Sequence, residues 1–409
     1  MHTLLFVLIV AILVAEFGLN RFLSILNFRN SRLALPPELS GIYSPEAYAR
    51  QQQYFRSNIR FGALSATFNL FLLVGMYWAG GFGWLDSFLL TITDNEILRS
   101  LLFFGILYLV SDLLNIPFDW YDTFVIEEKF GFNKVTPALF VADKIKSTLL
   151  MVLLGGGLLA LIIRIYQLTS DYFWLITFGV VSLVGVVLSM FYSEWIVPLF
   201  NKQTALEDGE LRDAISTFAD KAGFQLANIY VIDGSRRSTK ANAYFSGLGS
   251  RKRIVLYDTL IQQMTTDEIV AVLAHEVGHY KHKHVLKGFL VSLPFNLLLF
   301  YLLGLTLKSD YPALVVGGAS ASFHLNAIVF FTLYTPVSSA FDLVGNLISR
   351  RHEYQADAYA VSYGYGDQLI SSLKKLSATS LSNLMPHPLY VFFNYSHPTL
   401  YQRIKKITG

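Results

Sequence analysis

The sequence predicts a mainly α-helical, polytopic membrane protein that carries an α/β catalytic region on one face. Of its 409 residues, 53% are hydrophobic and 15% are charged, whereas a soluble domain carries about 25% charged residues. Apolar runs long enough to cross a bilayer recur along the chain, and the mean hydropathy is +0.45. These observations exclude a soluble globular protein and a disordered one, because neither keeps this much apolar surface in water.

Seven apolar runs approach the ~20 residues that a helix needs to span the hydrocarbon core. The first has no basic start and no small-residue cleavage site, so we expect a retained span rather than a signal peptide. The predicted spans lie at residues 2–26, 62–85, 98–118, 147–168, 172–197, 285–307 and 323–348.

Lysine and arginine are distributed unequally between the two sides of these spans. The segments that follow spans one, three, five and seven hold 27 of the 32 basic residues. By the positive-inside rule these segments face the cytoplasm, with the N-terminus outside and the C-terminus inside. The chain then divides into a membrane domain (1–197), a first catalytic segment (198–284), spans six and seven (285–348) and a second catalytic segment (349–409).

The first catalytic segment has the pattern of a small α/β unit. Glu210–Gly223 has helical apolar spacing, and Ile229–Ile232 is typical of a short strand. Asn242–Ser246 and Arg253–Asp258 are predicted as two strands joined by a glycine-containing turn. A further helix is expected to begin at Thr265 or Thr266, either of which suits an N-cap, and to run through His284.

That last helix contains the sequence His-Glu-Val-Gly-His at positions 275–279. Two histidines four residues apart lie on one helix face, so His275 and His279 can reach a single Zn²⁺ ion. Glu276 is offset from that face, where it can hold a water molecule rather than bind the metal. Surface histidines are the plain alternative, but the apolar stretch Ile269–Leu273 predicts a buried helix, in which histidine and glutamate need partners.

Catalytic zinc needs a third protein ligand and an open coordination position. The chain has no cysteine, so thiolate ligands are excluded. His282 and Val285 occupy positions where the metzincin pattern requires Gly and His, which excludes that branch. His282 and His284 stay candidates, although their Lys-His-Lys-His context is more typical of a solvated helix end.

The best candidates for the third ligand are Glu353 and Asp357, directly after span seven. They are four residues apart on a predicted helix, so one carboxylate can bind zinc while the other orients a ligand histidine. An ion-paired helix start involving Arg350 and Arg351 is the alternative, and His352 is expected to point elsewhere.

The acidic residues inside or at the ends of predicted spans include Asp112, Glu194 and Asp342. Charged side chains in hydrocarbon are costly unless they face a wet interior, so they predict an aqueous chamber among the helices. Positions near span ends, where a charge costs little, are the alternative for Asp112 and Glu194.

With these residues in view, the chain resembles the type I CAAX prenyl proteases, which are integral-membrane zinc endopeptidases with seven spans. The resemblance extends over nearly the whole chain, and it is carried by an ordered set of motifs rather than by the zinc motif alone. These motifs are Phe124–Lys134, Pro198–Lys202, Val231–Arg237, Asn242–Gly247, Arg253–Leu260, His275–His279, Arg350–Ala360, Ser396–Pro398 and Arg403–Ile404.

The resemblance implies one zinc ion per chain, held by His275, His279 and Glu353. It also implies Glu276 as the general base, Asp357 as a residue that supports a ligand, and His397 in the active site. A lone histidine before proline is otherwise more often a capping or packing residue. At the active site, His397 can donate a hydrogen bond to a tetrahedral oxyanion.

A predicted edge strand is the candidate substrate site. Its residues Asn242, Ala243, Tyr244 and Phe245 can pair with a substrate peptide by β-augmentation, which gives affinity largely independent of side chains. A basic cluster nearby either meets lipid headgroups or a terminal carboxylate, or forms a solvated rim. It comprises Arg236, Arg237, Lys240 and Arg251–Arg253.

We therefore expect a zinc metalloendopeptidase that acts on peptide or protein substrates at a bilayer and binds no nucleic acid. The family substrate is a prenylated, C-terminal Cys-a-a-X sequence. A short outside loop at 308–322 and a tail without a dilysine signal suggest a bacterial inner-membrane relative, for which quality-control proteolysis is expected. A noncatalytic zinc-binding transporter or scaffold is the alternative from another class. A site-two-type protease fits poorly, because its motif lies within a span.

Overall fold

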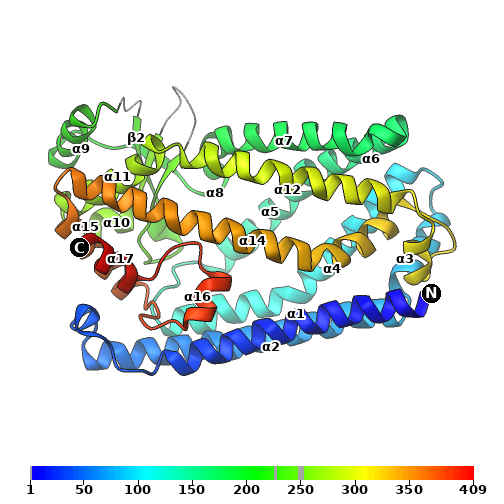
Figure 1. Cartoon of the computed structure of the whole chain (residues 1–409), viewed down its shortest axis with the longest axis horizontal. Coiled ribbons are helices and arrows are strands. Elements are labelled where there is room, and N and C mark those ends of the chain that lie inside the picture. The colour runs from blue at the N-terminus through cyan, green and yellow to red at the C-terminus, as the bar shows by residue number, and fades with distance from the viewer. Residues whose placement is uncertain (1, 225–227, 247–252) are drawn as a thin grey trace.

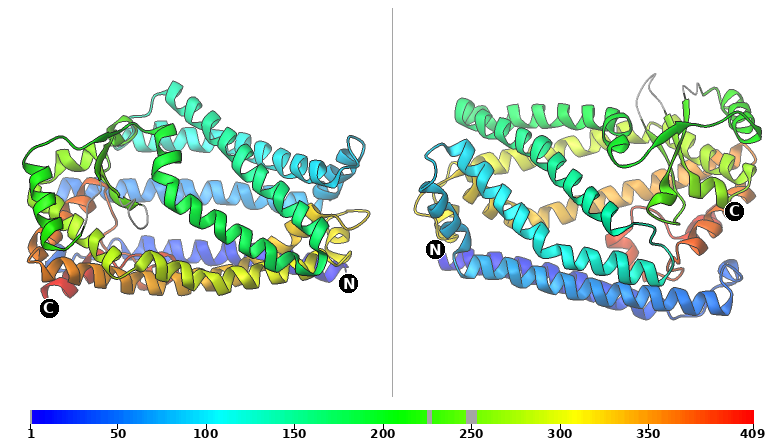
Figure 2. Two further views of the ribbon diagram at one scale, coloured as in Figure 1. Left: turned by 90° about the horizontal axis from the view of Figure 1, so that it is seen from above. Right: turned by 180° about the vertical axis from the view of Figure 1, so that it is seen from behind.

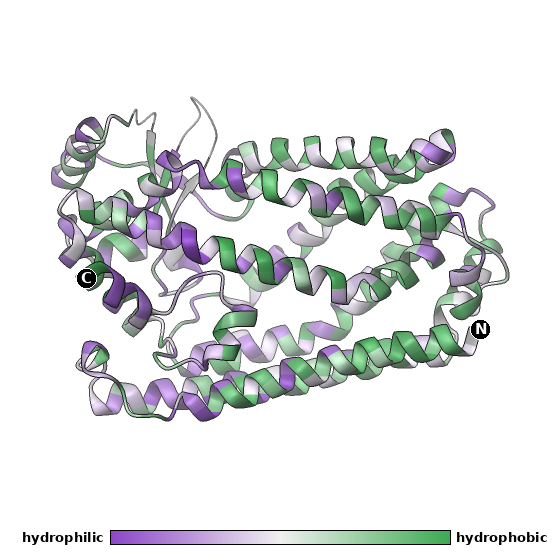
Figure 3. Ribbon diagram, in the orientation of Figure 1, coloured by the Kyte–Doolittle hydropathy of each residue, from purple (hydrophilic) through white to green (hydrophobic). Residues whose placement is uncertain are grey.

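A computed structural model describes residues 2–224, 228–246 and 253–409, and its fold is mainly helical. Long helices run side by side along the longest axis, and an α/β region lies at one end with the C-terminus (Figure 1). The N-terminus lies at the opposite end. Apolar residues dominate the long helices, whereas polar residues gather around the α/β end (Figure 3).

The long helices have the length and composition of membrane spans. Large apolar side chains such as Phe71 and Leu153 are more than two-thirds exposed, as expected where lipid replaces water. The helices of this part are α1 (His2–Asn30), α2 (Pro45–Trp78), α3 (Gly81–Leu90), α4 (Glu96–Tyr121), α5 (Pro137–Leu150), α6 (Gly156–Thr169), α7 (Phe173–Phe191), α12 (His284–Leu307) and α14 (Phe323–Ser362). Three π-helical segments continue α4, α5 and α7: η2 (Asp122–Glu127), η3 (Met151–Gly155) and η5 (Tyr192–Ile196).

Within the described residues, 6 continuous helical stretches are long and apolar enough to cross a membrane. One of them, Pro137–Phe200, folds back at Ser170–Tyr172, so it contains both the fourth and the fifth predicted spans (Figures 1 and 2). The predicted second span at 62–85 is wrong at its end. Gly80 adopts a left-handed conformation (φ 65°), which ends α2 at Trp78 and starts the separate helix α3.

The α/β region contains a four-stranded sheet with the order β1-β2-β4-β3. The central strands β2 (Asn228–Ile232) and β4 (Arg253–Tyr257) are parallel, with Ile229 opposite Ile254. β1 (Gln203–Ala205) and β3 (Ala243–Ser246) are antiparallel edge strands. The expected strand at 242–246 is thus confirmed from Ala243 onward, and the expected turn at 247–252 lies outside the described residues.

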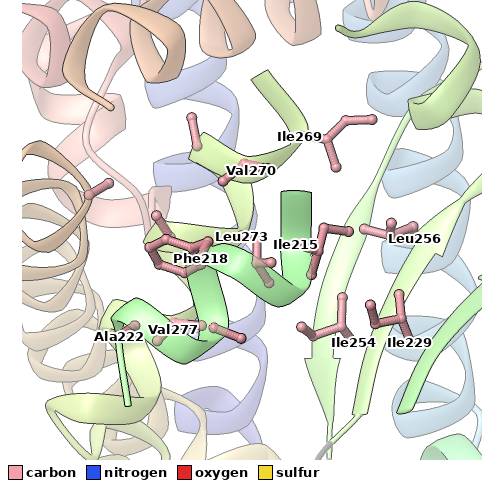
Figure 4. Close-up of a cluster of buried hydrophobic side chains, with 14 of the residues drawn as sticks. Ile215, Phe218, Ala222, Ile229, Ile254, Leu256, Ile269, Val270, Leu273 and Val277 are labelled. Atoms are coloured by element: carbon pink, nitrogen blue, oxygen red, sulfur yellow. The ribbon is translucent and has the colours of Figure 1, made fainter. Parts of the chain in front are cut away.

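The sheet packs against two helices through one apolar core (Figure 4). α9 (Glu210–Lys221) matches the predicted helix, and Gly223 (φ 57°) follows it in the left-handed conformation typical of a C-cap. α11 (Thr266–Lys281) begins with a capping box between Thr265 and Glu268. The core joins these elements through Ile215, Phe218, Ile229, Ile254, Leu256, Ile269, Val270, Leu273 and Val277.

The prediction that the motif helix continues through His284 is wrong. α11 ends at Lys281, Lys283 adopts a left-handed conformation (φ 55°), and α12 starts at His284. The sequence offers no glycine or asparagine at this break, and a left-handed lysine costs about 1 kcal/mol. The break places Nδ1 of His284 2.9 Å from Nδ1 of His279.

α14 is a single helix of 40 residues that runs from the N-terminal end of the bundle into the α/β region (Figure 1). At its start, the fully buried His324 places Nε2 2.8 Å from Asp86 Oδ1 and Nδ1 2.9 Å from Ser100 Oγ. At its other end it carries Glu353 and Asp357, both buried. One element therefore connects the far end of the membrane part with the candidate site.

Smaller elements complete the fold. Around the sheet and the C-terminus these are α8 (Val197–Phe200), η6 (Gly234–Arg236), α10 (Asp258–Gln263), α15 (Gly366–Thr379), α16 (Pro388–Asn394) and α17 (Leu400–Thr408). In the connections they are η1 (Pro37–Leu39), η4 (Ser170–Tyr172) and α13 (Tyr311–Val315).

Candidate metal centre and active site

The motif helix α11 presents both histidines to one point. Nε2 of His275 and Nε2 of His279 are 3.1 Å apart, with the two rings nearly perpendicular. Spacing of i and i+4 produces this convergence, and the buried residues just before the motif fix the helix against the core. His275 is buried, and His279 and Glu276 are half-buried.

The glycine of the motif allows α14 to approach α11 closely. A Cβ atom added at Gly278 would lie 2.9 Å from Ala356 Cα, closer than real Cβ contacts allow, and 3.0 Å from Tyr359 Cβ. A larger residue would therefore push α14 away. The glycine is what brings the carboxylate of Glu353, one turn earlier on α14, beside the two imidazoles.

Glu353 completes a set of three possible ligands. Its Oε1 lies 3.2 Å from His279 Nε2, and its Oε2 lies 3.5 Å from His275 Nε2. One ligand atom from each residue falls within 4.8 Å of the others, which suits a single metal ion. Within the described chain, Oε2 of Glu353 is buried without a hydrogen bond of good geometry, as expected of an atom whose partner is a metal.

Asp357 supports His275 rather than joining the ligand set. Its Oδ1 lies 2.8 Å from His275 Nδ1, so it accepts the Nδ1 proton and leaves Nε2 free for a metal. The buried Arg403 on α17 donates to both oxygens of Asp357, with distances of 2.9 and 2.6 Å. The bidentate pair compensates two charges that would otherwise be costly to bury.

His279 is supported by a neutral chain of hydrogen bonds. The amide oxygen of Gln355 lies 2.8 Å from His284 Nε2 and can only accept, so His284 donates from Nε2. Nδ1 of His284 is then an acceptor for Nδ1–H of His279, 2.9 Å away. This arrangement leaves Nε2 of His279 with its lone pair for a metal.

The prediction that His284 belongs to a solvated helix end is wrong, because its side chain is buried and its ring stacks on His352 at 3.9 Å. His282, in contrast, is exposed as expected. Burial lowers the pKa of His352, with the positive charge of Lys287 adding to the effect. Among the described residues, the side chains of His282 and His352 form no hydrogen bond or ion pair with the three candidate ligands.

We expect His284→Phe to weaken metal binding by about 10- to 100-fold, because the acceptor for His279 Nδ1–H is lost. Phenylalanine keeps the ring that stacks on His352. Metal affinity is measured by competition with a chelator, and His282→Phe is the matched control. If His284→Phe binds metal as tightly as His282→Phe does, the supporting role of His284 is refuted.

His397 lies at the open side of this cluster. Its Nδ1 is 3.0 Å from Glu353 Oε2, and its side chain is exposed, so a substrate can reach it. This close contact with the Glu353 carboxylate raises the pKa of His397, and the nearby negative charge of Glu276 adds to this effect. The structure thus brings together all six residues predicted for metal binding and catalysis: His275, Glu276, His279, Glu353, Asp357 and His397.

The predicted substrate strand lies at the edge of the sheet, as expected. β3 pairs only with β4 among the described strands, and it also contacts α11. Tyr244 Oη lies 3.4 Å from Ser193 Oγ. Asn242 precedes the strand, where its Oδ1 accepts a hydrogen bond from the Ala243 amide. Phe245 belongs to β3 by its backbone.

Three residues of the predicted basic cluster join the catalytic region to the membrane helices. Each pairs with an acidic residue from a membrane segment. These three residues therefore neither bind lipid headgroups or a terminal carboxylate nor form a solvated rim. The pairs are Arg237–Asp143 at 2.9 Å, Lys240–Glu127 at 2.8 Å and Arg253–Glu194 at 2.8 Å. Two further members of the predicted cluster, Arg251 and Lys252, lie outside the described residues.

Sequence reasoning missed Arg403 and Gln355 as parts of the site, and it kept His284 only as a candidate ligand, not as a partner of His279. A signal for Arg403 existed, since Leu400, Arg403, Ile404 and Ile407 follow the i, i+3, i+4, i+7 spacing of a buried helix face. An arginine on such a face needs an acidic partner. No comparable signal predicted that His284 would support His279, because its place depends on the helix break at Lys283.

The fold and site together define a class: a membrane-embedded metallopeptidase whose histidine pair and glutamate come from two helices packed side by side. The similarity of the chain to known protein families agrees with this class. Residues 24–202 match the model described as CAAX prenyl protease N-terminal, five membrane helices, and residues 205–409 match Peptidase family M48. The chain belongs to peptidase family M48 and is a multi-pass membrane metalloendopeptidase that acts on peptide or protein substrates.

Named relatives are similar over nearly the whole chain. CAAX prenyl protease 1 of Saccharomyces cerevisiae is 36% identical, covering 96% of this chain and 92% of the relative. The CAAX prenyl protease 1 homologs of Arabidopsis thaliana and Homo sapiens are 37% and 30% identical, covering 92% and 91% of this chain and 90% and 88% of their own lengths. The crystal structure of S. mikatae Ste24p superimposes with a TM-score of 0.94 at 34% identity, covering 99% of both chains. Membership of a peptidase family also argues against the noncatalytic transporter or scaffold.

Proposed function

We propose that this metalloendopeptidase binds one zinc ion through Nε2 of His275, Nε2 of His279 and the carboxylate of Glu353. The observation that carries the proposal is the convergence of these ligand atoms within 4.8 Å, with a buried carboxylate oxygen that lacks a hydrogen bond of good geometry. Nitrogen and carboxylate ligands in this number suit catalytic zinc, which keeps one position open.

The catalytic roles follow from where the side chains lie. A bound zinc ion would polarise the scissile carbonyl and lower the pKa of water. Glu276 takes a proton from the attacking water and later delivers it to the leaving amine. His397, exposed beside Glu353, donates a hydrogen bond to the oxyanion that develops on the former carbonyl. Asp357 and His284 hold the ligand imidazoles in the tautomers that metal binding needs.

Substrate binding is proposed at the edge of the sheet. An extended peptide would pair with the free edge of β3, formed by Ala243, Tyr244 and Phe245, with Asn242 at its start. This pairing holds the peptide backbone beside α11 and leaves selectivity to pockets farther along the chain. The position of β3 as an outer strand in contact with the motif helix supports the proposal.

We infer that the substrate is a prenylated protein ending in Cys-a-a-X. The relatives named above are CAAX prenyl proteases and match the chain over most of its length. The distribution of basic residues supports an active site at the cytoplasmic face, with the N-terminus outside. The bacterial inner membrane stays a prediction that rests on the short 308–322 loop, and it belongs with quality-control proteolysis rather than with a prenylated substrate. The named relatives are eukaryotic.

Cleavage assays in liposomes test the substrate class. With zinc supplied, we expect a farnesylated Cys-a-a-X peptide to be cleaved at least about tenfold faster than the same peptide without the lipid, because burial of the isoprenoid adds binding energy. The matched control is the protein carrying Glu276→Gln. Degradation of unfolded membrane proteins, with no cleavage of the farnesylated peptide, would instead support quality-control proteolysis.

A further inference from the structure

Asp112, Glu194 and Asp342, three of the acidic residues in the predicted spans, have different surroundings. Asp112 pairs with Lys144 at 2.9 Å, and Glu194 pairs with Arg253 at 2.8 Å. Asp342 on α14 is exposed, and the described part of the chain provides it with no hydrogen bond or ion pair. An uncompensated carboxylate within a membrane helix is costly unless water or a ligand meets it, and such a residue most often marks a functional path.

Asp342 lines a cavity that begins at the candidate metal centre. The cavity has a volume of about 630 Å³ and lies between α12 and α14. One end is formed by His279, His284 and His352, and the lining continues past Asn346 to Asp342. Among the described residues that line it, none is lysine or arginine, so Asp342 is its single formal charge.

Asp342 and Glu353 project from the same face of α14. They are separated by 11 positions, which at about 100° per residue is close to three full turns. The rise along the helix between them is about 16 Å. An extended peptide advances about 3.3 Å per residue, so about five residues of substrate span that distance.

We propose that this cavity binds the substrate chain on its way from the metal centre, and that Asp342 selects a lysine or arginine about five residues from the cleaved bond. The proposal rests on the Cys-a-a-X function proposed above. Only three residues follow the cysteine in such a substrate, so a residue five positions from the cleaved bond cannot lie on its C-terminal side. The cationic residue therefore lies on the N-terminal side of the cleaved bond. The metal centre is about two Debye lengths away and does not cancel this attraction.

Charge reversal tests the proposal. A series of farnesylated Cys-a-a-X peptides carries lysine, glutamine or glutamate at one variable position. Between peptides, this position is shifted from three to seven residues before the cleaved bond. With the wild-type protein we expect lysine at about the fifth position to raise kcat/KM about fivefold over glutamine, and glutamate to lower it. Asp342→Asn should remove the preference, and Asp342→Lys should reverse it toward the glutamate peptide.

Two controls separate this effect from a loss of folding. The glutamine peptide reports the activity of each variant independently of charge, so the lysine-to-glutamate ratio is the measured quantity. Asp112→Asn removes another acidic residue of a span, one that already pairs with Lys144, and should leave that ratio at the wild-type value.

The outcomes distinguish the two proposals. Equal cleavage of all charged peptides by wild type, or a ratio unchanged in Asp342→Lys, overturns the role of Asp342 while the Cys-a-a-X function stands. Failure to cleave every farnesylated peptide, including the glutamine series, overturns the substrate class itself and with it the selection by Asp342.

Discussion

Glu276→Gln is expected to abolish proteolysis while the metal stays bound. Glutamine keeps the size and the hydrogen-bonding reach of Glu276 but cannot accept a proton from water, so kcat should fall by at least about 100-fold. The proposed ligands His275, His279 and Glu353 are unchanged, so the metal content should stay at one ion per chain. The measurement is peptide cleavage beside metal analysis of the same purified sample.

The matched control is the substitution His282→Gln. His282 is exposed directly after the motif helix α11, and among the described residues its side chain forms no hydrogen bond or ion pair with a candidate ligand. It should keep both activity and metal. Wild-type turnover by Glu276→Gln would remove Glu276 as the general base, and loss of metal from this variant would show that Glu276 is a ligand instead.

Glu353→Gln is expected to lose both the metal and the activity. The amide is nearly isosteric with the carboxylate, so the packing against Arg403 and His397 is kept. The charged carboxylate ligand, however, is replaced by a neutral amide that binds zinc weakly. We expect metal affinity to fall by more than about 100-fold, beyond the 10- to 100-fold loss typical of an outer partner. Chelator competition and thermal unfolding with and without zinc measure the change.

Asp357→Asn provides the comparison for this variant, because Asp357 touches His275 but lies outside the ligand set. Its loss of affinity should be the smaller of the two. Retention of tightly bound metal by Glu353→Gln would contradict the assignment of the third ligand, and equal losses in both variants would leave no reason to rank Glu353 above Asp357.

Much of the site could be predicted because its chemistry is local. The pair His275 and His279 needs nothing beyond helical spacing to share a metal, and Ile269–Leu273 indicates that the helix is buried. Glu353 is different, since it lies 74 positions after His279 and the residues alone left Glu353 and Asp357 as equal candidates. The structure separates their positions: Glu353 approaches both Nε2 atoms, whereas Asp357 meets Nδ1 of His275.

The errors arose where the course of the backbone depends on tertiary contacts. A helix through His284 was the natural expectation, because Lys283 carries no signal for a left-handed residue. Apolar composition continues through Gly80 into α3, so it predicts a second span that extends past the end of α2 at Trp78. Nothing in the sequence predicts the ion pairs of the basic cluster, because its acidic partners belong to membrane segments far away along the chain. These partners are Glu127, Asp143 and Glu194.

The continuity of α14 links the candidate metal centre to the membrane part of the protein. His324 fixes the start of this helix, and Glu353 lies about 43 Å farther along the same rod. His275 and His279 belong to a separate helix that packs closely on α14 at Gly278. A tilt of α14 to match bilayer thickness would strain this contact and shift Glu353 relative to the two histidines. We therefore expect zinc retention to vary with membrane thickness and with the choice of detergent.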